Sequence, residues 1–96
     1  MYVKVHGREG EVLVAVCDKE LLGKTLMEDD LVMGVGEDFF KGELIKPDSL
    51  EGFLGKASIL NLVGNDVVDR AVSGGFVDAD SVLEIAGVKH AQVVEL

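Results

Sequence analysis

The feature that most constrains the fold is an unbroken apolar run, VLVAVC, that extends from Val12 to Cys17. Such a run is typical of a strand that is covered on both faces of a sheet. Ahead of it, residues 2–6 place valine at every second position, which is the period of a strand with one buried face. The intervening GREG, residues 7–10, has the glycines of a tight turn. The sequence therefore predicts an N-terminal hairpin whose second strand lies inside a sheet.

Capping residues predict two helices in the first two thirds of the chain. Asp18 is placed as the N-cap of a short helix over KELLGKTL, residues 19–26. After Pro47, which ends an extended segment, Asp48 is placed as the next N-cap, and Glu51 stands three residues later as in a capping box. Both helices have apolar residues available for burial, namely Leu21, Leu22 and Leu26 in the first and Leu50, Phe53, Leu54 and Ala57 in the second.

The clearest helix signal begins at Asn65, which is placed as an N-cap, with Asp66 in the positive first turn. The pair Gly74-Gly75 is placed at its end. The segment just before this helix, SILNLV from Ser58 to Val63, fits either a strand or a continuing helix, because so short an apolar run does not separate the two.

Three further strands are predicted from apolar segments, LVMGV at residues 31–35, VLEI at 82–85 and QVVEL at 92–96. GVKHAQ, residues 87–92, joins the last two, so His90 is predicted to lie in a loop, where side chains often serve a function. Together these elements predict an α+β fold. It consists of a single small domain over residues 1–96, with a mixed sheet, N-terminal and C-terminal hairpins and about three helices.

The composition is that of a chain that folds around a core, with 48% apolar and 28% charged residues. The one cysteine, Cys17, cannot form an internal disulfide, and the sequence opens without the basic segment, apolar run and cleavage site of a secretion signal. The longest apolar run is about a third of the roughly 20 residues that a membrane-spanning helix needs. We therefore expect a cytoplasmic protein that does not associate with membranes.

The charge balance is strongly acidic, with 18 acidic residues against nine basic ones and a net charge of −9. This charge repels the phosphates of nucleic acids and anionic lipids, and the basic residues do not cluster in the sequence. Direct, tight binding of nucleic acid is therefore not expected, whereas a protein partner is compatible with the charge. The sequence predicts no particular oligomeric state.

Cys17 and His90 are the candidate catalytic residues. A cysteine nucleophile needs a histidine within hydrogen-bond distance, and Asn61 or Gln92 could orient the ring. The alternatives are that Cys17 is a small apolar core residue and that His90 binds backbone carbonyls through its ring nitrogens. The residue types alone leave both an enzyme and a binding module open.

Neither a metal site nor a cofactor is predicted. His6, Cys17 and His90 have none of the short spacings that zinc motifs show. The GKT of residues 23–25 matches the end of a phosphate-binding loop, but Asp18 stands where that loop has its first glycine. An ordinary amphipathic helix is the preferred interpretation of this segment.

Several segments together resemble a known family, namely MYVKVH, EVLVAVCDKELLGKTL, NLVG, GFVD and GVKHAQ. In this order, and over essentially the whole chain, they look like the archaeal family of small proteins catalogued as domain of unknown function 424. By resemblance, the family's motif positions fall on Cys17, Asp18, Leu22, Gly23, Asn61, Gly64, Gly87, His90, Ala91 and Gln92. Lys89 stands where the family usually has proline, so the segment around it is expected to be less rigid.

The resemblance implies a small archaeal protein of the cytosol whose genes often lie among translation genes. An accessory role around translation or RNA handling is implied, and the acidic charge favours a protein partner over RNA for that role. The predicted function is accordingly a binding or accessory module, with an enzyme that uses Cys17 and His90 in a small pocket as the alternative. The predicted ligand-binding residues are Asn61, Gly64, Gly87, His90 and Gln92.

Overall fold

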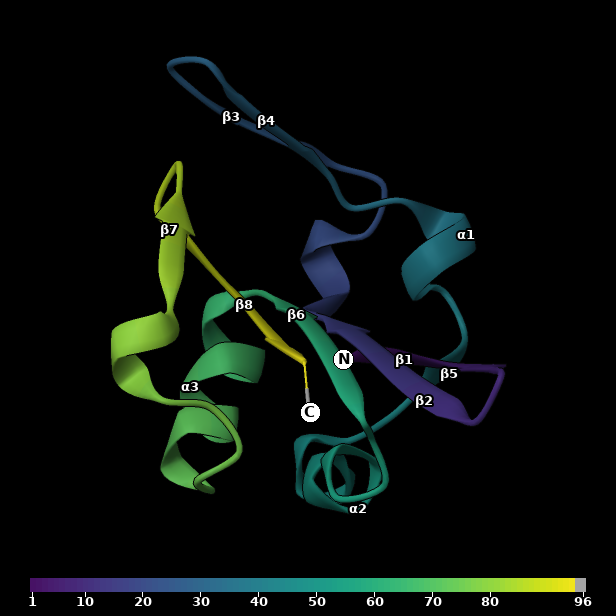
Figure 1. Ribbon diagram of the computed structural model, residues 1–96. Helices are drawn as coiled ribbons and strands as arrows, with labels where there is room; N and C mark the ends of the chain where they lie inside the picture. The colour runs from purple at the N-terminus through teal and green to yellow at the C-terminus, as the bar shows by residue number, and fades with distance from the viewer. Residues whose placement is uncertain (95–96) are drawn as a thin grey trace.

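A mixed six-stranded sheet forms the body of the computed structural model, which describes residues 1–94 (Figure 1). Its strands are β1 (Tyr2–Arg8), β2 (Glu11–Cys17), β5 (Glu43–Leu44), β6 (Ile59–Val63), β7 (Leu83–Ile85) and β8 (Val88–Val94), in the spatial order β5-β1-β2-β6-β8-β7. A second, two-stranded sheet consists of β3 (Thr25–Glu28) and β4 (Leu31–Gly34). The helices are α1 (Glu37–Phe40), α2 (Leu50–Leu54) and α3 (Asn65–Ser73), with short 3-10 turns η1 (Lys19–Leu21), η2 (Pro47–Ser49) and η3 (Ala79–Ser81). The predicted α+β fold is confirmed.

The N-terminal hairpin is confirmed, with β1 and β2 paired antiparallel along their whole length. Glu9 and Gly10 both have positive φ angles, as the two residues of a tight hairpin turn require. The apolar run of β2 is explained by burial on both faces, because Val14 and Val16 belong to one core cluster and Ala15 and Cys17 to another.

The segment Ser58 to Val63, which fitted either a strand or a helix, contains strand β6. It pairs in parallel with β2 on one side and antiparallel with β8 on the other. Leu60 and Leu62 face the same core cluster as Val14 and Val16. Its place between two other strands gives it a sheet partner on each side.

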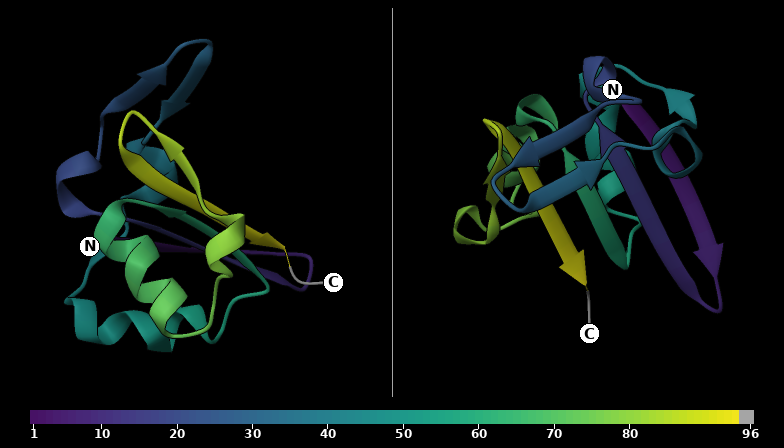
Figure 2. Two further views of the ribbon diagram at one scale, coloured as in Figure 1. Left: turned by 90° about the vertical axis from the view of Figure 1, so that its left-hand side faces the viewer. Right: turned by 90° about the horizontal axis from the view of Figure 1, so that it is seen from above.

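Different layers cover the two faces of the sheet. On one face, α2 and α3 pack against the sheet through Leu50, Leu54, Val67, Val68 and Ala71. On the other face lie α1 and the β3–β4 hairpin, which contribute Phe40 and Leu26 to a second cluster. Figure 2 shows the hairpin as an arm that extends over this face toward β7. Within residues 1–94 no helix combines the length and apolar character that crossing a bilayer requires.

The predicted helix over residues 19–26 is wrong. Only η1 is helical there, and β3 begins at Thr25. Gly23 has a φ of 84°, which turns the chain, and its N–H donates to the carbonyl of Val35 at 2.7 Å. The segment thereby pairs with the chain beyond β4 and does not continue as a helix. The third helix of the fold is α1, which the sequence analysis did not predict.

The cap assignments of the other two helices need correction, although both helices exist. The N-cap of α3 is Gly64, and the side chain of Asn65 binds the backbone of Gly87 and Lys89 instead. Asp48 and Glu51 make no capping box, because both carboxylates bind the guanidinium of Arg70 on α3. These acids therefore link two helices and do not cap one.

The C-terminal hairpin is confirmed, but GVKHAQ is not its loop. The turn consists of Ala86 and Gly87 alone, and Val88 already begins β8. His90 and Gln92 are strand residues, since β8 pairs with β7 and with β6 at the same time. The last two residues of the predicted strand 92–96 lie outside the described residues.

Candidate functional site

The candidate residues Asn61, His90 and Gln92 lie on the sheet face that α1 and the β3–β4 hairpin cover in part. Directly paired residues of neighbouring strands point to the same side of a sheet, so the register arranges them in rows across the strands. The two rows that contain the candidates are Ala15–Asn61–Gln92 and Cys17–Val63–His90. The structure thus brings these three polar residues of β6 and β8 together.

Asn61 and Gln92 are direct neighbours across two strands. Gly64 N–H donates to the carbonyl of Lys89, which makes 64 and 89 a hydrogen-bonded position of this antiparallel pair. The hydrogen-bonded positions alternate, so Asn61 and Gln92 form a position without backbone bonds between them. Their Cα atoms are therefore only about 4.5 Å apart and their side chains are close.

The side-chain oxygen of Asn61 is buried and has no hydrogen-bond partner in residues 1–94. A buried polar atom without a partner costs roughly 1–3 kcal/mol of stability. Nearly all buried polar atoms in proteins are satisfied, so each exception requires an explanation. A donor N–H or O–H supplied by a bound molecule would satisfy this oxygen.

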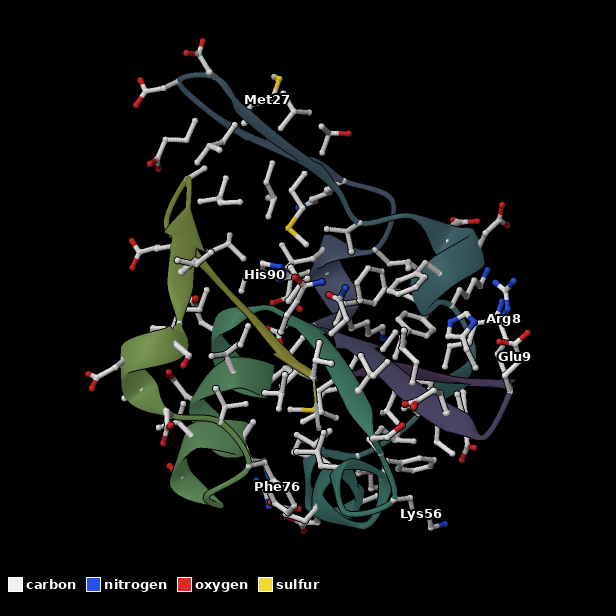
Figure 3. The ribbon with its side chains drawn as sticks, in the orientation of Figure 1. Arg8, Glu9, Met27, Lys56, Phe76 and His90 are labelled. Carbon is white, nitrogen blue, oxygen red and sulfur yellow. The ribbon has the colours of Figure 1, made fainter. Side chains whose placement is uncertain are left out.

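His90 presents one ring nitrogen to the fold and leaves the other available. Its Nδ1 lies 2.9 Å from the carbonyl oxygen of Leu62, and because a carbonyl only accepts, Nδ1 carries the proton and donates. In the neutral ring Nε2 is then a hydrogen-bond acceptor. Figure 3 shows His90 at β8, below the β3–β4 hairpin. The half-buried ring is thus held in orientation by the neighbouring strand.

Cys17 does not meet His90. Val63 lies between them in the same row, so their Cα atoms are two strand spacings apart, roughly 10 Å. The thiol is fully buried among Leu26, Val35 and Phe40. Burial, with a smaller effect of the neighbouring Asp18 carboxylate, raises the pKa of the Cys17 thiol to about 11. A thiol in this environment is inert at neutral pH, which disfavours nucleophilic catalysis by Cys17.

Gly64 serves the junction between β6 and α3. Its φ of 121° is a conformation that only glycine adopts readily, and a Cβ atom there would lie 2.3 Å from Cγ of Asp18. Asp18 is buried, and its two carboxylate oxygens accept from the N–H groups of Asp66 and Val67 at 3.1 and 3.0 Å. Burial raises the pKa of the Asp18 carboxyl, while these two N–H donors act in the opposite direction. Gly64 is therefore required so that Asp18 can cap α3.

Gly87 serves the turn between β7 and β8. Its φ of 80° and the φ of 52° at Ala86 are the conformations of a two-residue hairpin turn. The amide of Asn65 holds this turn against α3, since its Nδ2 donates to the carbonyl of Gly87 and its Oδ1 accepts from the N–H of Lys89. Of the five predicted ligand-binding residues, Gly64 and Gly87 thus have backbone roles, and Asn61, His90 and Gln92 form the polar cluster.

A hollow of about 650 Å³ lies next to this polar cluster. It is at the end of the face away from the β3–β4 hairpin, beside the turn between β1 and β2. Leu13 and Ile59 are in its lining and occupy the row beside Ala15 and Asn61. His6 and Phe39 line it as well, with their rings stacked at 5.0 Å and the Nε2 atom of His6 2.9 Å from the carbonyl of Phe39. This hollow does not follow from the sequence, because no local pattern shows that Phe39 reaches β1.

Among residues 1–94, no group of three or more histidine, cysteine, aspartate or glutamate side chains is arranged to hold a metal ion. His6, Cys17 and His90 lie on three different strands, β1, β2 and β8. Their ring nitrogens and sulfur engage separate surroundings, namely the carbonyl of Phe39, an apolar cluster and the carbonyl of Leu62.

The sequence matches one family model, described as protein of unknown function (DUF424), over residues 6–96. The chain belongs to this family. Its fold is similar to the crystal structure of an uncharacterized conserved protein from Methanopyrus kandleri, with a TM-score of 0.82 and 25% sequence identity. The similarity covers 96% of this chain and 88% of that one. None of the curated proteins matches the sequence. The family description and the description of the similar structure both state no activity.

Proposed function

We propose that this DUF424 protein is a binding module that recognises a protein partner through the sheet face around Asn61, His90 and Gln92. The observation that carries the proposal is the buried side-chain oxygen of Asn61, which no group in residues 1–94 satisfies. Beside it stand the exposed amide of Gln92 and the orientated ring of His90. Together they offer donors and acceptors that a partner's backbone or polar side chains can bind.

The acidic charge supports a protein as the partner. A net charge of −9 opposes association with RNA or DNA, whose affinity for proteins depends on basic contacts to phosphates. The accessory role around translation or RNA handling that the family resemblance implies is part of this proposal, with the contact made through a protein in the cytoplasm. An enzyme based on Cys17 and His90 is the weaker candidate, because Val63 separates the two residues and the thiol is buried.

If Asn61 serves binding, its unsatisfied side chain should lower the stability of the free protein. Asn61→Leu replaces the unsatisfied amide with an apolar side chain of similar size, so the free energy of unfolding should stay constant or rise by about 1 kcal/mol. Urea denaturation of the wild-type protein and the variant measures this difference. A loss of more than about 1 kcal/mol would mean that Asn61 is structural and would contradict the proposal.

The same variant tests recognition directly. The immobilised wild-type protein is exposed to an extract of the cells that produce it, and the retained proteins are identified and compared with those retained by Asn61→Leu. Ser73→Leu is the matched control, because it places the same side chain at an exposed position of α3, on the opposite face of the sheet. We expect the wild type and the control to retain the same protein and Asn61→Leu to lose it. Retention of nucleic acid alone, or identical retention by all three, would overturn the proposal.

A further inference from the structure

Strand β8 is longer than the edge strand that covers it. Its pairing with β7 ends at Leu83 and His90, and the chain before Leu83 turns into η3. Figure 1 shows β7 and the segment before it diverging from β8 on the outer side of the sheet. Residues 91–94 of β8 therefore have β6 on one side and, among the described residues, no strand on the other.

The backbone groups that face this open side can be assigned from the register. In an antiparallel strand the N–H and C=O of one residue point to the same side, and the side alternates along the strand. Lys89 directs its carbonyl toward Gly64 at the end of β6, so Ala91 and Val93 also point toward β6. Gln92 and Val94 consequently point outward. Their N–H and C=O groups have no ladder partner in residues 1–94.

We propose that an extended, basic segment of a protein partner adds to the sheet as a strand along residues 91–94 of β8. This inference rests on the proposed function, because it specifies how the partner binds beside Asn61 and Gln92. Addition of a strand to an open sheet edge derives its affinity from main-chain hydrogen bonds and its specificity from alternate side chains. The outward groups of Gln92 and Val94 supply the bonds. The exposed side chain of Gln92 lies on the face of the polar cluster.

The charge around the edge indicates a basic occupant. Asp78 and Asp80 are exposed on the segment that runs from α3 to β7 beside this edge. Lys89, the nearby lysine of β8, is already paired with Asp69 of α3. A second copy of this chain would bring its own acidic residues against these two, which disfavours edge-to-edge pairing of identical chains. Lysine or arginine side chains of a partner would be attracted instead.

The other face of the sheet, which α2 and α3 cover, offers space for an apolar side chain at the same edge of β8. A hollow of about 360 Å³ lies against Val93 and is lined also by Leu60 and Phe76. Phe76 is labelled near the lower end of the molecule in Figure 3. Side chains of an added strand alternate between the two faces, so a residue opposite Val93 would point to the face that carries this hollow. The partner segment is therefore expected to alternate basic and apolar residues.

Amide hydrogen exchange in the complete wild-type protein tests the inference. The probe is a capped heptapeptide in which lysine alternates with valine, and the control peptide has glutamate in place of lysine. At a probe concentration about ten times its Kd, about nine-tenths of the protein is bound, so exchange at the N–H groups of Gln92 and Val94 should slow about tenfold. Ala91 and Val93, already bonded to β6, should change little. The acidic peptide should have no effect.

Three variants separate the strand edge from the polar side chains. Val94→Pro removes one outward N–H without removing a bond to β6 and should weaken binding of the basic peptide, whereas Val94→Thr keeps that N–H and should not. Gln92→Ala keeps the edge and removes only the polar side chain. If no slowing occurs at Gln92 and Val94, if the acidic peptide binds equally, or if protection depends on protein concentration without peptide, strand addition is wrong. The proposed function is tested separately by retention from the cell extract. It is supported if Asn61→Leu loses the partner protein that Ser73→Leu retains, and it is wrong if both variants retain the same proteins.

Discussion

Gly64 shows how one residue can be fixed by the space that a distant side chain needs. Its φ of 121° and the 2.3 Å that would separate a Cβ atom from Cγ of Asp18 leave no room for a larger residue. Gly75 is a natural comparison, because its φ is also positive, at 81°, but no atom lies within 4 Å of the Cβ position. Both glycines have a positive φ, but only at Gly64 would a Cβ atom meet another side chain.

Gly64→Ala should therefore be far more destabilising than Gly75→Ala. An alanine in the left-handed region costs roughly 1–2 kcal/mol. The backbone cost at Gly64 is at least as large, because its φ of 121° and ψ of 145° are close to a region that is almost exclusive to glycine. At Gly64 the added carbon must also displace the Asp18 carboxylate, which removes a helix cap that contributes about 0.5–2 kcal/mol. We expect Gly64→Ala to lose roughly 2 kcal/mol more than Gly75→Ala in urea denaturation. Equal losses would show that the contact with Asp18 is unimportant.

The buried thiol of Cys17 should be protected from chemical modification in the native protein. The buried thiol has a pKa of about 11, so the native protein should react with a thiol reagent at pH 8 only as fast as it unfolds. An unfolded cysteine titrates near about 8.5, so deprotonation favours the unfolded state above that pH. The stability that the protonated thiol contributes is complete below about pH 8.5 and is lost as the pH rises toward about 11.

Cys17→Ala provides the control for this pH dependence, because it has no thiol to titrate. The difference in unfolding free energy between the wild type and Cys17→Ala should become smaller between about pH 8.5 and 11. Rapid labelling of the native wild type at pH 7 would indicate a reactive thiolate. That result would favour the enzyme over the binding module.

At the scale of the elements, α3 is capped from another part of the fold. The carboxylate of Asp18, at the end of β2, accepts from two N–H groups in the first turn of α3, 48 and 49 residues away in the sequence. Asn65, which has the residue type of an N-cap, binds the β7–β8 turn instead. Strand β2, helix α3 and the C-terminal hairpin are thereby joined at one corner of the sheet.

Asp18→Ala should consequently destabilise the whole domain. It leaves the buried N–H of Val67 and the partly buried N–H of Asp66 without an acceptor, and we expect a loss of about 2–3 kcal/mol. Asp18→Asn retains one acceptor oxygen and should lose about half as much. Asp48→Ala is the control, because its ion pair with Arg70 is exposed to solvent and should contribute little to stability. Faster amide exchange at Asp66 and Val67 in Asp18→Ala would locate the effect at α3, and unchanged exchange there would contradict it.

The whole molecule carries much more negative than positive charge. Three ion pairs occur within the described residues, and they involve two of the nine basic side chains, Arg70 and Lys89. Most acidic side chains therefore repel one another across the surface. This repulsion opposes the compact state and is screened by salt.

Molar potassium chloride should accordingly raise the melting temperature at neutral pH. If screening recovers about 1 kcal/mol, Tm should rise by roughly 4–8 °C in a domain of this size. The control is the same pair of melts near pH 4.5, the isoelectric point of the sequence, where the net charge is close to zero and the shift should be small. A rise of equal size at both pH values would attribute the effect to apolar burial rather than to charge.

Elements whose signal is local could be predicted from the sequence. The β1–β2 hairpin and the extent of α3 follow from the spacing of apolar residues and from glycines at their ends, which act over a few neighbouring positions. The family motif also pointed to Asn61, His90 and Gln92. Their assembly on one face did not follow from the sequence, because it depends on the register between β6 and β8.

The remaining assignments depend on pairing and packing between elements. Ser58–Val63 could have been a helix until β2 and β8 supplied strand partners to Ile59–Val63. Residues 19–26 do not form the predicted helix. The side chain of Asp18 caps α3 instead, and the N–H of Gly23 donates to Val35, beyond β4. His90 became a strand residue because the hairpin turn needs only Ala86 and Gly87. In each case the deciding hydrogen bonds join residues far apart in the chain or depend on strand pairing, whereas sequence patterns report only local preference.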